Sequence, residues 1–259
     1  MRYGILSDVH ANLPALEAAL TALDDQRVDR VLCAGDVVGY GPHPDECAAR
    51  IAAEGIPCVA GNHDLMAIER LTMERADELA RTTMEWTRRA IADDTRAFLD
   101  ALPPRIEEDD LTVAHGTLSD PTIYVRTGEA AAEQVEELVR SGLAGPLVIG
   151  HTHVPHAYGR ERGRLLHARA GEVELAPGEA HLLNPGSVGQ ARERRPLARL
   201  MVLDTDASRA SFLALAYDHR RTRRALVSAG LPPSAHHRKV TLRDRAARAK
   251  GAVVTRLRR

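Results

Sequence analysis

The sequence predicts an α/β protein with the architecture of a four-layer α/β/β/α sandwich. Over the first 65 residues, short apolar runs alternate with stretches whose apolar residues recur at helical spacing. After residue 155 the pattern changes to short, β-like segments separated by glycine-rich turns, which are typical of an antiparallel sheet. Two sheets with helices outside each of them give the four layers.

The N-terminal part predicts a βαβαβ unit. The first helix has leucines at helical spacing on one face: Leu13, Leu16, Leu20 and Leu23. The predicted elements are, in order, a strand at 2–7, a helix at 12–24, a strand at 30–34, a helix at 43–54 and a strand at 57–60. Such alternation implies parallel strands joined by right-handed crossovers.

The middle of the chain predicts a long helical insertion at about 74–101, ended by the proline pair at 103–104. Four apolar residues mark one of its faces: Leu79, Trp86, Ala90 and Leu102. The insertion fits a lid or wall of a site, a peripheral helix, or a contact through Trp86 in a homodimer. A strand at 111–114, a helix at 129–141 and a strand at 146–149 are predicted to follow it.

The C-terminal part predicts a second, mostly antiparallel sheet. Its segments are 155–158, 164–168, 172–176, 182–184, 199–204 and 211–217. From about residue 220 the apolar periodicity fades and arginine dominates. We therefore predict one domain at residues 1–219 and a basic, weakly packed or partly disordered tail at 220–259, with a helix near 241–257.

The charge is distributed unevenly along the chain. The formal net charge is −1, but residues 219–259 hold 11 Arg and 2 Lys against the single Asp244, a balance of +12. The other 218 residues therefore carry −13. A basic tail can supply salt-dependent contacts to nucleic acid phosphates. The sequence favours the alternative, a tail attracted to its own acidic body.

The composition and the N-terminal sequence indicate the cellular compartment of the protein. Hydrophobic residues make up 44% and charged residues 27%, as in ordinary globular proteins. The N-terminus does not resemble a secretory signal, and no apolar run reaches the ~18 residues of a membrane helix. The three cysteines, Cys33, Cys47 and Cys58, have no metal-type spacing. We therefore expect a cytoplasmic protein without a membrane partner.

Five short segments carry the chemistry, and each follows an apolar run typical of a buried strand. They read SDVH, AGDVVG, AGNHD, VAHG and IGHTH, and they supply Asp8 and His10, Asp36, Asn62 with His63 and Asp64, His115, and His151 with His153. Loops at the carboxyl ends of such strands are where open α/β sheets bind ligands. A single Asp or His there could cap a turn, but five such strand ends together predict a site.

These residue types are suited to phosphate ester hydrolysis by a pair of metal ions. Two cations ~3.5–4 Å apart can activate a water molecule, assist the leaving oxygen and neutralise the phosphate oxygens. Such a pair needs a bridging carboxylate and several His or amide ligands, which the five segments provide. The absence of cysteine from them favours two Mn²⁺ or Fe ions, with Zn²⁺, Ni²⁺ and Mg²⁺ as alternatives.

With these motifs the chain resembles the calcineurin-like metallophosphoesterase family. All five signature blocks are present over residues 7–153, and NPGSVG at 184–189 is similar to a block of its small bacterial, YfcE-like phosphodiesterase branch. The resemblance implies the family's four-layer fold. It also implies hydrolysis of a small phosphodiester, nucleotide or phosphomonoester by a hydroxide that bridges the two metals.

The resemblance also implies a role for each residue. Seven would be metal ligands: Asp8, His10 and His153 on the first ion, Asn62, His115 and His151 on the second, and Asp36 between them. Asn62 would also contact the substrate. His63 would be the catalytic acid near the leaving group, and Asp64 would orient it by accepting its ring proton.

One departure from the family pattern narrows the function. Many members carry an Asp-Arg pair after the second block, where this chain reads GDVVGYGP, with Gly39 and Tyr40. The missing arginine argues against a phosphoprotein phosphatase and favours the small phosphodiesterase branch.

Asn12 is a candidate phosphate contact or, equally, a helix N-cap. Ser187, in the NPGSVG block, is expected to have a structural role in a tight turn.

Two other functions remain as alternatives. Some relatives are metal-site scaffolds that bind protein partners without turnover, but these tend to lose the histidine of the third block, which is intact here. A nuclease that uses the basic tail is the second alternative. A small phosphate ester is the expected partner, with nucleic acid less favoured.

Overall fold

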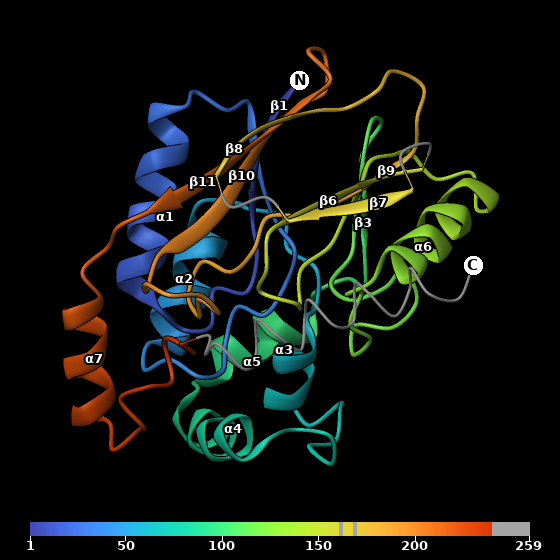
Figure 1. Ribbon diagram of the computed structural model, residues 1–259. Helices are drawn as coiled ribbons and strands as arrows, with labels where there is room; N and C mark the ends of the chain where they lie inside the picture. Colours follow the sequence, from blue (N-terminus) through green and yellow to red (C-terminus); the bar gives the residue numbers. More distant parts are fainter. Residues whose placement is uncertain (161–162, 168–169, 240–259) are drawn as a thin grey trace.

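The computed structural model describes residues 1–259 except 161–162, 168–169 and 240–259. It contains two sheets that pack face to face, with helices outside each (Figure 1). This arrangement confirms the predicted four-layer sandwich. The helix predicted near 241–257 lies outside the described residues. Within the described part, no helix combines the length and apolar character needed to cross a membrane.

The first sheet has five strands in the order β2-β1-β10-β11-β8. Their bounds are β1 Arg2–Leu6, β2 Arg30–Cys33, β8 Gly171–Glu174, β10 Ala198–Asp204 and β11 Arg209–Leu215. β1 runs parallel to β2 and antiparallel to β10, with Ile5 opposite Leu32 and Met201. The first and last thirds of the chain are therefore joined in one sheet.

The second sheet has six strands in the order β3-β4-β5-β9-β6-β7. Their bounds are β3 Ile106–Glu107, β4 Thr112–Val113, β5 Leu147–Val148, β6 His156–Gly159, β7 Arg164–His167 and β9 His181–Asn184. β4, β5 and β9 are parallel, and β6 pairs antiparallel with both β9 and β7.

Seven helices are described: α1 Leu13–Asp25, α2 Pro44–Ala53, α3 Asn62–Ala67, α4 Glu78–Ala90, α5 Asp93–Asp100, α6 Gly128–Arg140 and α7 His219–Ser228. α1 and α2 cover the outer face of the first sheet, and α6 covers that of the second (Figure 1). Three apolar clusters fill the spaces between layers; the central one, between the two sheets, includes Ile5, Val148 and Phe212. Because each sheet is covered on both faces, central strands such as β1, β5 and β10 are largely apolar runs.

The division of strands between the sheets corrects the prediction. The expected N-terminal parallel sheet and C-terminal antiparallel sheet are not separate, because β10 and β11 join β1, while β4 and β5 join β9. The predicted strand at 57–60 is only an isolated parallel bridge between Cys33 and Cys58. Local apolar patterns predict strands, but they do not specify which distant strand each one pairs with.

The helical stretch predicted at 74–101 consists of two helices, α4 and α5. Ile91 and Ala92 have extended backbone, and the Ala92 N–H donates to the Asp45 carboxylate at 3.0 Å instead of continuing the helix. The buried face of α4 is also shifted from the predicted one. It consists of Ala80, Thr83, Met84 and Thr87, while Ala90 is exposed.

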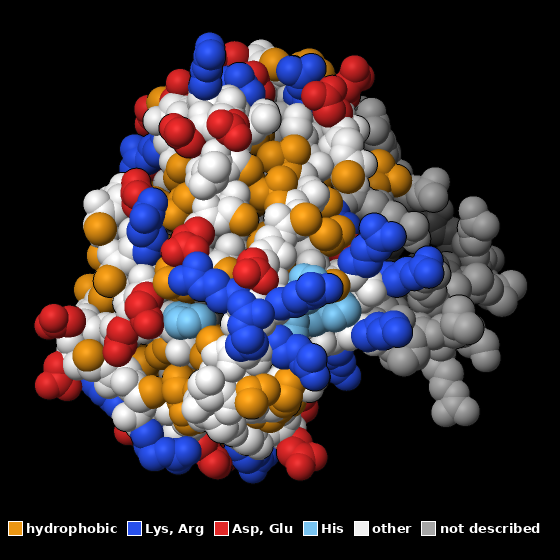
Figure 2. Space-filling model, turned by 90° about the vertical axis from the view of Figure 1, so that its left-hand side faces the viewer, with side chains coloured by type: hydrophobic (Ala, Val, Ile, Leu, Met, Phe, Trp, Pro, Cys, Tyr) orange, Lys and Arg blue, Asp and Glu red, His pale blue; other side chains and the backbone are white. Residues whose placement is uncertain are grey.

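The predicted tail is packed up to residue 239, which corrects the expectation of a weakly packed segment from residue 220. α7 buries Thr222 and Leu226, and the segment after it buries Leu231 and Ala235 against Tyr40 and α4. Trp86 packs against the same cluster, so its apolar ring already has contacts within the chain. Figure 2 presents the side of the molecule on which α7 lies, with Lys and Arg side chains in a band beside histidines.

Candidate metal centre

The predicted ligands meet where parallel strands of both sheets end. The loops after β1 and β2 come from the first sheet, and the loops after β4 and β5 come from the second. The chain after the Cys58 bridge leads directly into α3, which carries Asn62 and His63 at its start. The carboxyl ends of five segments that are far apart in the sequence therefore surround one point, as the strand pattern predicted.

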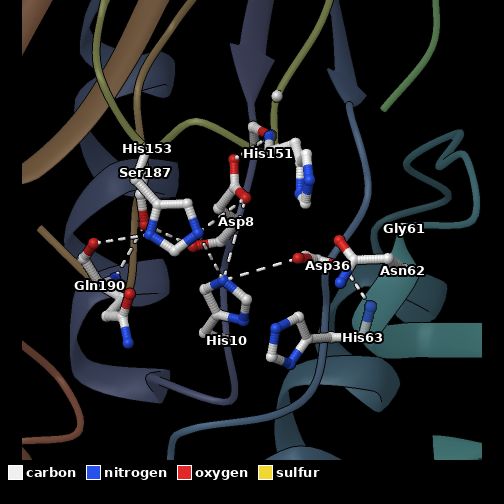
Figure 3. A network of polar contacts seen from close by, with 12 residues as sticks. Asp8, His10, Asp36, Gly61, Asn62, His63, His151, His153, Ser187 and Gln190 are labelled. Atoms are coloured by element: carbon white, nitrogen blue, oxygen red, sulfur yellow. Dashed lines mark hydrogen bonds and ion pairs between the residues drawn. The ribbon is translucent and has the colours of Figure 1, made fainter. Parts of the chain in front are cut away.

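The first group of side chains contains Asp8, His10, Asp36 and His153, which turn toward one another in Figure 3. Each offers one ligand atom, and these atoms lie within 4.8 Å of one another. His153 Nε2 is 3.2 Å from Asp8 Oδ1 and 3.1 Å from His10 Nε2. His10 Nε2 is 3.6 Å from Asp36 Oδ2.

The second group contains Asp36, His115 and His151, again with ligand atoms within 4.8 Å of one another. His115 Nε2 lies 3.3 Å from Asp36 Oδ2 and 3.1 Å from the Asn62 side-chain oxygen. Asn62 therefore belongs with the second group. Asp36 is common to both groups, which is the position predicted for a bridging carboxylate.

Backbone carbonyls orient three of the four histidines. The Nδ1 atoms of His10, His115 and His153 lie 3.1, 2.7 and 2.9 Å from the carbonyl oxygens of Val38, Ala34 and Gln190. An N–H at Nδ1 leaves the lone pair of Nε2 directed into the site, as a metal ligand requires. His151 differs, because its Nε2 bonds the Thr122 carbonyl at 3.1 Å, so Nδ1 is the atom left for a metal.

The donor set fits cations, since two buried carboxylate oxygens accept no hydrogen bond of good geometry. Among the described residues, Asp8 Oδ1 and Asp36 Oδ2 are in this position, and their polar neighbours are the Nε2 atoms of His153 and His115, at 3.2 and 3.3 Å. The other oxygen of each carboxylate is satisfied: Asp8 Oδ2 accepts from the Ser7 hydroxyl and the His151 N–H, and Asp36 Oδ1 accepts from the His63 N–H. An unpaired buried carboxylate oxygen is costly, and a bound cation removes that cost.

The backbone is strained at the same residues. Asp8, His10, Asp36, His151 and His153 all have positive φ, between 47° and 64°. Each such residue costs on the order of 1–3 kcal/mol, and clusters of them mark functional sites. Gly61 shows how closely the loops approach, because a Cβ there would collide with the Asp36 carboxylate. Folding therefore stabilises a geometry that is disfavoured locally but brings the side chains together.

The charges of the site depend on one another. Burial acts to raise the pKa values of Asp8 and Asp36, but neighbouring histidines outweigh it and hold both well below the usual range. Burial lowers the pKa of His151 to about 3, with His115 adding to the effect. His115 itself differs: burial lowers its pKa, but the Asp36 charge prevails and raises it to about 10. A cation that binds here must displace that proton.

His63 lies beside the two groups, on the wall of the adjoining cavity. Its ring is 4.8 Å from that of His10 and 4.6 Å from that of Tyr40, and its Nδ1 atom is buried without a hydrogen-bond partner. A Cβ on Gly39 would come within 2.5 Å of that Nδ1. The two residues in which the chain departs from the family pattern, Gly39 and Tyr40, thus shape the space around His63.

Asp64 was predicted to accept the ring proton of His63, but its hydrogen bonds are to backbone groups instead. Its two carboxylate oxygens accept hydrogen bonds from the backbone N–H groups of Asp36, Val38 and Gly61, at 2.8, 3.1 and 3.0 Å. Burial, with the Asp36 charge adding to it, raises the pKa of Asp64 to about 7, although the N–H donors oppose this. Because its hydrogen bonds are to backbone N–H groups of two loops, Asp64 holds together the loops that carry Asp36 and Asn62.

Asn12 occupies the N-cap position of α1, as one of its two predicted roles requires, but its side chain makes no cap hydrogen bond. It is fully buried; its amide donates to the Gly189 carbonyl and the Tyr217 hydroxyl, and its oxygen accepts from Thr222. These bonds attach the N-terminus of α1 to α7. Ser187 has the structural role expected of it, donating to the Asp8 carbonyl at 2.8 Å and accepting from the Gln190 N–H.

A cavity of about 390 Å³ opens beside the two groups. Its lining includes Asn62, His63 and His151, the segment from Leu71 to Asp77, and four arginines: Arg75, Arg126, Arg192 and Arg238. The Tyr124 ring stacks on His151 with centroids 3.8 Å apart, and the Arg126 guanidinium lies 3.7 Å from the Tyr124 centroid.

Gln190, Arg192 and Tyr124 lie in or beside the site but were not predicted from the sequence. Gln190 and Arg192 directly follow the NPGSVG block, so the end of that block was the available signal. Tyr124 follows His115 of the fourth block by nine residues and has no comparable marker in the sequence.

The chain is similar to known proteins over most of its length. A solved metallophosphoesterase from Sphaerobacter thermophilus is 34% identical, with a TM-score of 0.78, and the match covers 91% of this chain and 97% of that one. An uncharacterized protein of Methanocaldococcus jannaschii is 29% identical over 232 residues, which are 88% of this chain and 93% of the relative. A hypothetical protein from Pyrococcus horikoshii, 16% identical, shares the fold with a TM-score of 0.73, over 90% of this chain and 95% of that one.

The family-level match covers most of the chain. The calcineurin-like phosphoesterase superfamily domain matches residues 1–208, which include every predicted ligand and every strand of both sheets except β11. The chain therefore belongs to the calcineurin-like phosphoesterase superfamily and is a phosphoric ester hydrolase.

Proposed function

We propose that this protein hydrolyses a small, anionic phosphate ester with the help of two metal ions, in the manner of the YfcE-like phosphodiesterases. Asp8, His10 and His153 would hold one ion and Asn62, His115 and His151 the other, with Asp36 shared. When bound, the two ions supply a nucleophilic hydroxide at neutral pH and positive charge for the phosphate oxygens. The observation that carries the proposal is Asp36, shared by two groups of buried ligand atoms.

The chain's own residues would contribute in three ways. The backbone carbonyls behind His10, His115 and His153 fix which ring nitrogen faces the site. The arginines of the cavity attract an anionic substrate and keep the remainder of the ester near the ligands. His63 faces the same cavity and would donate a proton to the leaving oxygen.

The protonation of His63 would depend on the substrate. Burial lowers the pKa of the free ring to about 4, with the Asp36 charge opposing the shift, so the ring is neutral before substrate binds. A phosphate anion next to the ring favours the charged form and raises this pKa. His63 would therefore become an acid when a substrate is present.

Metal-dependent turnover tests the proposal. Protein stripped with a chelator is reloaded separately with Mn²⁺, Fe²⁺, Zn²⁺, Ni²⁺ or Mg²⁺, and hydrolysis of bis(p-nitrophenyl) phosphate, p-nitrophenyl phosphate and nucleotides is measured. We expect activity only after reloading, and its loss together with metal in Asp36→Asn. Asp25→Asn, an equivalent change at an exposed position, serves as the control.

Two outcomes would contradict the proposal. Turnover that persists in the stripped protein would exclude metal-assisted hydrolysis. Stoichiometric metal with no turnover of any phosphate ester would favour the alternative of a binding scaffold.

A further inference from the structure

Arg192 lies at the edge of the metal centre, in the loop after β9. It is half-buried and lines the same cavity as Asn62, His63 and His151. Its Nη2 atom is 3.5 Å from Nε2 of His153, which is the nitrogen that faces the first group. Its guanidinium therefore borders the space in which a substrate phosphate would meet the ligands.

No carboxylate neutralises Arg192 within the described residues. Its neighbours in the structure do have such partners: Arg199 pairs with Glu193 at 2.6 Å, and Arg238 pairs with Asp77 at 3.4 Å. A guanidinium partly withdrawn from water without a counter-charge is unfavourable. An anion in the cavity would remove that cost.

Gln190 holds Arg192 and His153 together. Its backbone carbonyl accepts from His153 Nδ1 at 2.9 Å, and its side-chain oxygen accepts from Arg192 Nε at 3.4 Å. Its side-chain amide donates in turn to the Ala235 carbonyl, in the segment after α7. One buried residue, Gln190, thus positions both a candidate metal ligand and Arg192. A mobile surface arginine would not need such positioning.

We propose that Arg192 binds the nonbridging oxygens of the substrate phosphate and is the residue that makes the site selective for phosphate. The planar guanidinium carries paired N–H donors that match two oxygens of a phosphate, which a lysine cannot reproduce. This inference rests on the proposed function of the metal centre. It adds a substrate-binding residue, from a loop that contributes no ligand, to the residues that hold metal.

The test measures phosphate binding and turnover in the same proteins. Mn²⁺-loaded wild type, Arg192→Ala, Arg192→Lys and Arg195→Ala are titrated with inorganic phosphate by calorimetry, and kcat/KM is measured with bis(p-nitrophenyl) phosphate. Arg195 is exposed in the same loop and does not line the cavity, so it controls for lost charge. Metal content is determined for each protein by elemental analysis.

Removing charge-assisted hydrogen bonds should weaken phosphate binding by roughly 10- to 100-fold in Arg192→Ala, and kcat/KM should fall with it. Arg192→Lys should have a phosphate affinity and a kcat/KM between those of wild type and Arg192→Ala, because lysine keeps the positive charge but lacks the paired N–H donors. Arg195→Ala should match wild type, and all four proteins should keep the same metal content.

Three results would overturn the inference. The first is unchanged phosphate affinity in metal-loaded Arg192→Ala; the second is an equal loss in Arg195→Ala. The third is loss of metal from both Arg192 variants, which would make Arg192 a support for His153. Failure of the proposed function is distinguishable from these results, since wild type would then bind phosphate through Arg192 without hydrolysing any ester.

Discussion

Asp36 faces both ligand groups because its two carboxylate oxygens have different surroundings. Oδ1 accepts the His63 backbone N–H at 2.8 Å, which fixes the rotation of the carboxylate. Oδ2 is left between His10 and His115, at 3.6 and 3.3 Å. The motif AGDVVG predicted the residue, whereas the fixed rotation depends on α3 and could not be inferred from that motif.

His63 is predicted to act in catalysis without holding metal. His63→Ala should keep both ions and reduce kcat by ~10²–10⁴-fold, the usual contribution of a general acid. The loss should be larger for a nucleoside leaving group, which needs a proton, than for p-nitrophenolate, which does not. Measurement of kcat on both ester types, with metal content checked, decides this. Equal losses on the two esters would rule out the acid role.

Asp64 is predicted to act on stability, because its carboxylate satisfies three buried backbone donors. Asp64→Ala should lower the free energy of unfolding by roughly 2–5 kcal/mol. Asp64→Asn should lose less, since it keeps one acceptor oxygen. Denaturant unfolding of the two metal-free variants measures the difference. If both unfold like wild type, the three hydrogen bonds do not contribute as described.

At the residue scale the sequence predicted the candidate metal ligands better than the residues that surround them. Asp, His and Asn at strand ends are recognisable in short motifs, because their chemistry requires those residue types. Asn12 lies at the predicted N-cap position of α1, but the three partners of its side chain could not be inferred, since they come from residues 189, 217 and 222. Arg192 was missed because an arginine in a loop is ordinary until its neighbours are known.

At the element scale, the wall of the cavity is built by the segment before α4 and not by the two helices of the insertion. Residues from Leu71 to Asp77 line it, and Ala80 is the one α4 residue among the described lining. α4 packs through Leu79, Ala80 and Trp86 against α7 and the segment that follows it. Of the predicted insertion, residues 74–77 and Ala80 thus line the cavity.

A bulky residue in that wall should change substrate size preference. Thr72 is exposed and lines the cavity, whereas Thr82 is exposed on α4 and does not. Thr72→Trp should lower kcat/KM more for bis(p-nitrophenyl) phosphate than for p-nitrophenyl phosphate, because the diester needs more of the cavity. Thr82→Trp should leave the ratio unchanged. Identical ratios in both variants would show that the segment does not limit substrate size.

Element boundaries were predicted where local signals exist and missed where tertiary contacts decide. The leucine spacing of α1 and the prolines near α2 gave those helices closely. The break between α4 and α5 depends on Asp45, some 47 residues earlier, which accepts the Ala92 N–H. α7 is rich in arginine and shows little apolar periodicity, yet Thr222 and Leu226 dock it on the domain.

At the scale of the whole molecule, the site depends on both sheets. β1 and β2 supply Asp8, His10 and Asp36, and β4 and β5 supply His115, His151 and His153. The four-layer architecture could be predicted from the two sequence patterns. The distribution of strands could not, because the pairing of β1 with β10 joins residues about 200 positions apart.

Metal binding is predicted to release a proton, so it should strengthen with pH. Burial lowers the His115 pKa, but Asp36 overcomes this and raises it to about 10, so the ring is charged in the metal-free protein at pH 7. His151, with a pKa of about 3, is already neutral. The second group should therefore release roughly one proton on binding, and its affinity should rise as the pH rises towards 10. Calorimetry in two buffers of different ionisation enthalpy measures this, and identical apparent enthalpies would contradict it.

The central claim, a pair of metal ions that share Asp36, is tested most directly by anomalous diffraction from crystals of the Mn²⁺-loaded protein. The account predicts two anomalous peaks on either side of the Asp36 carboxylate. One should contact Asp8, His10 and His153, and the other Asn62, His115 and His151. A single peak at full occupancy, or two peaks of which one lies away from Asp36, would contradict it.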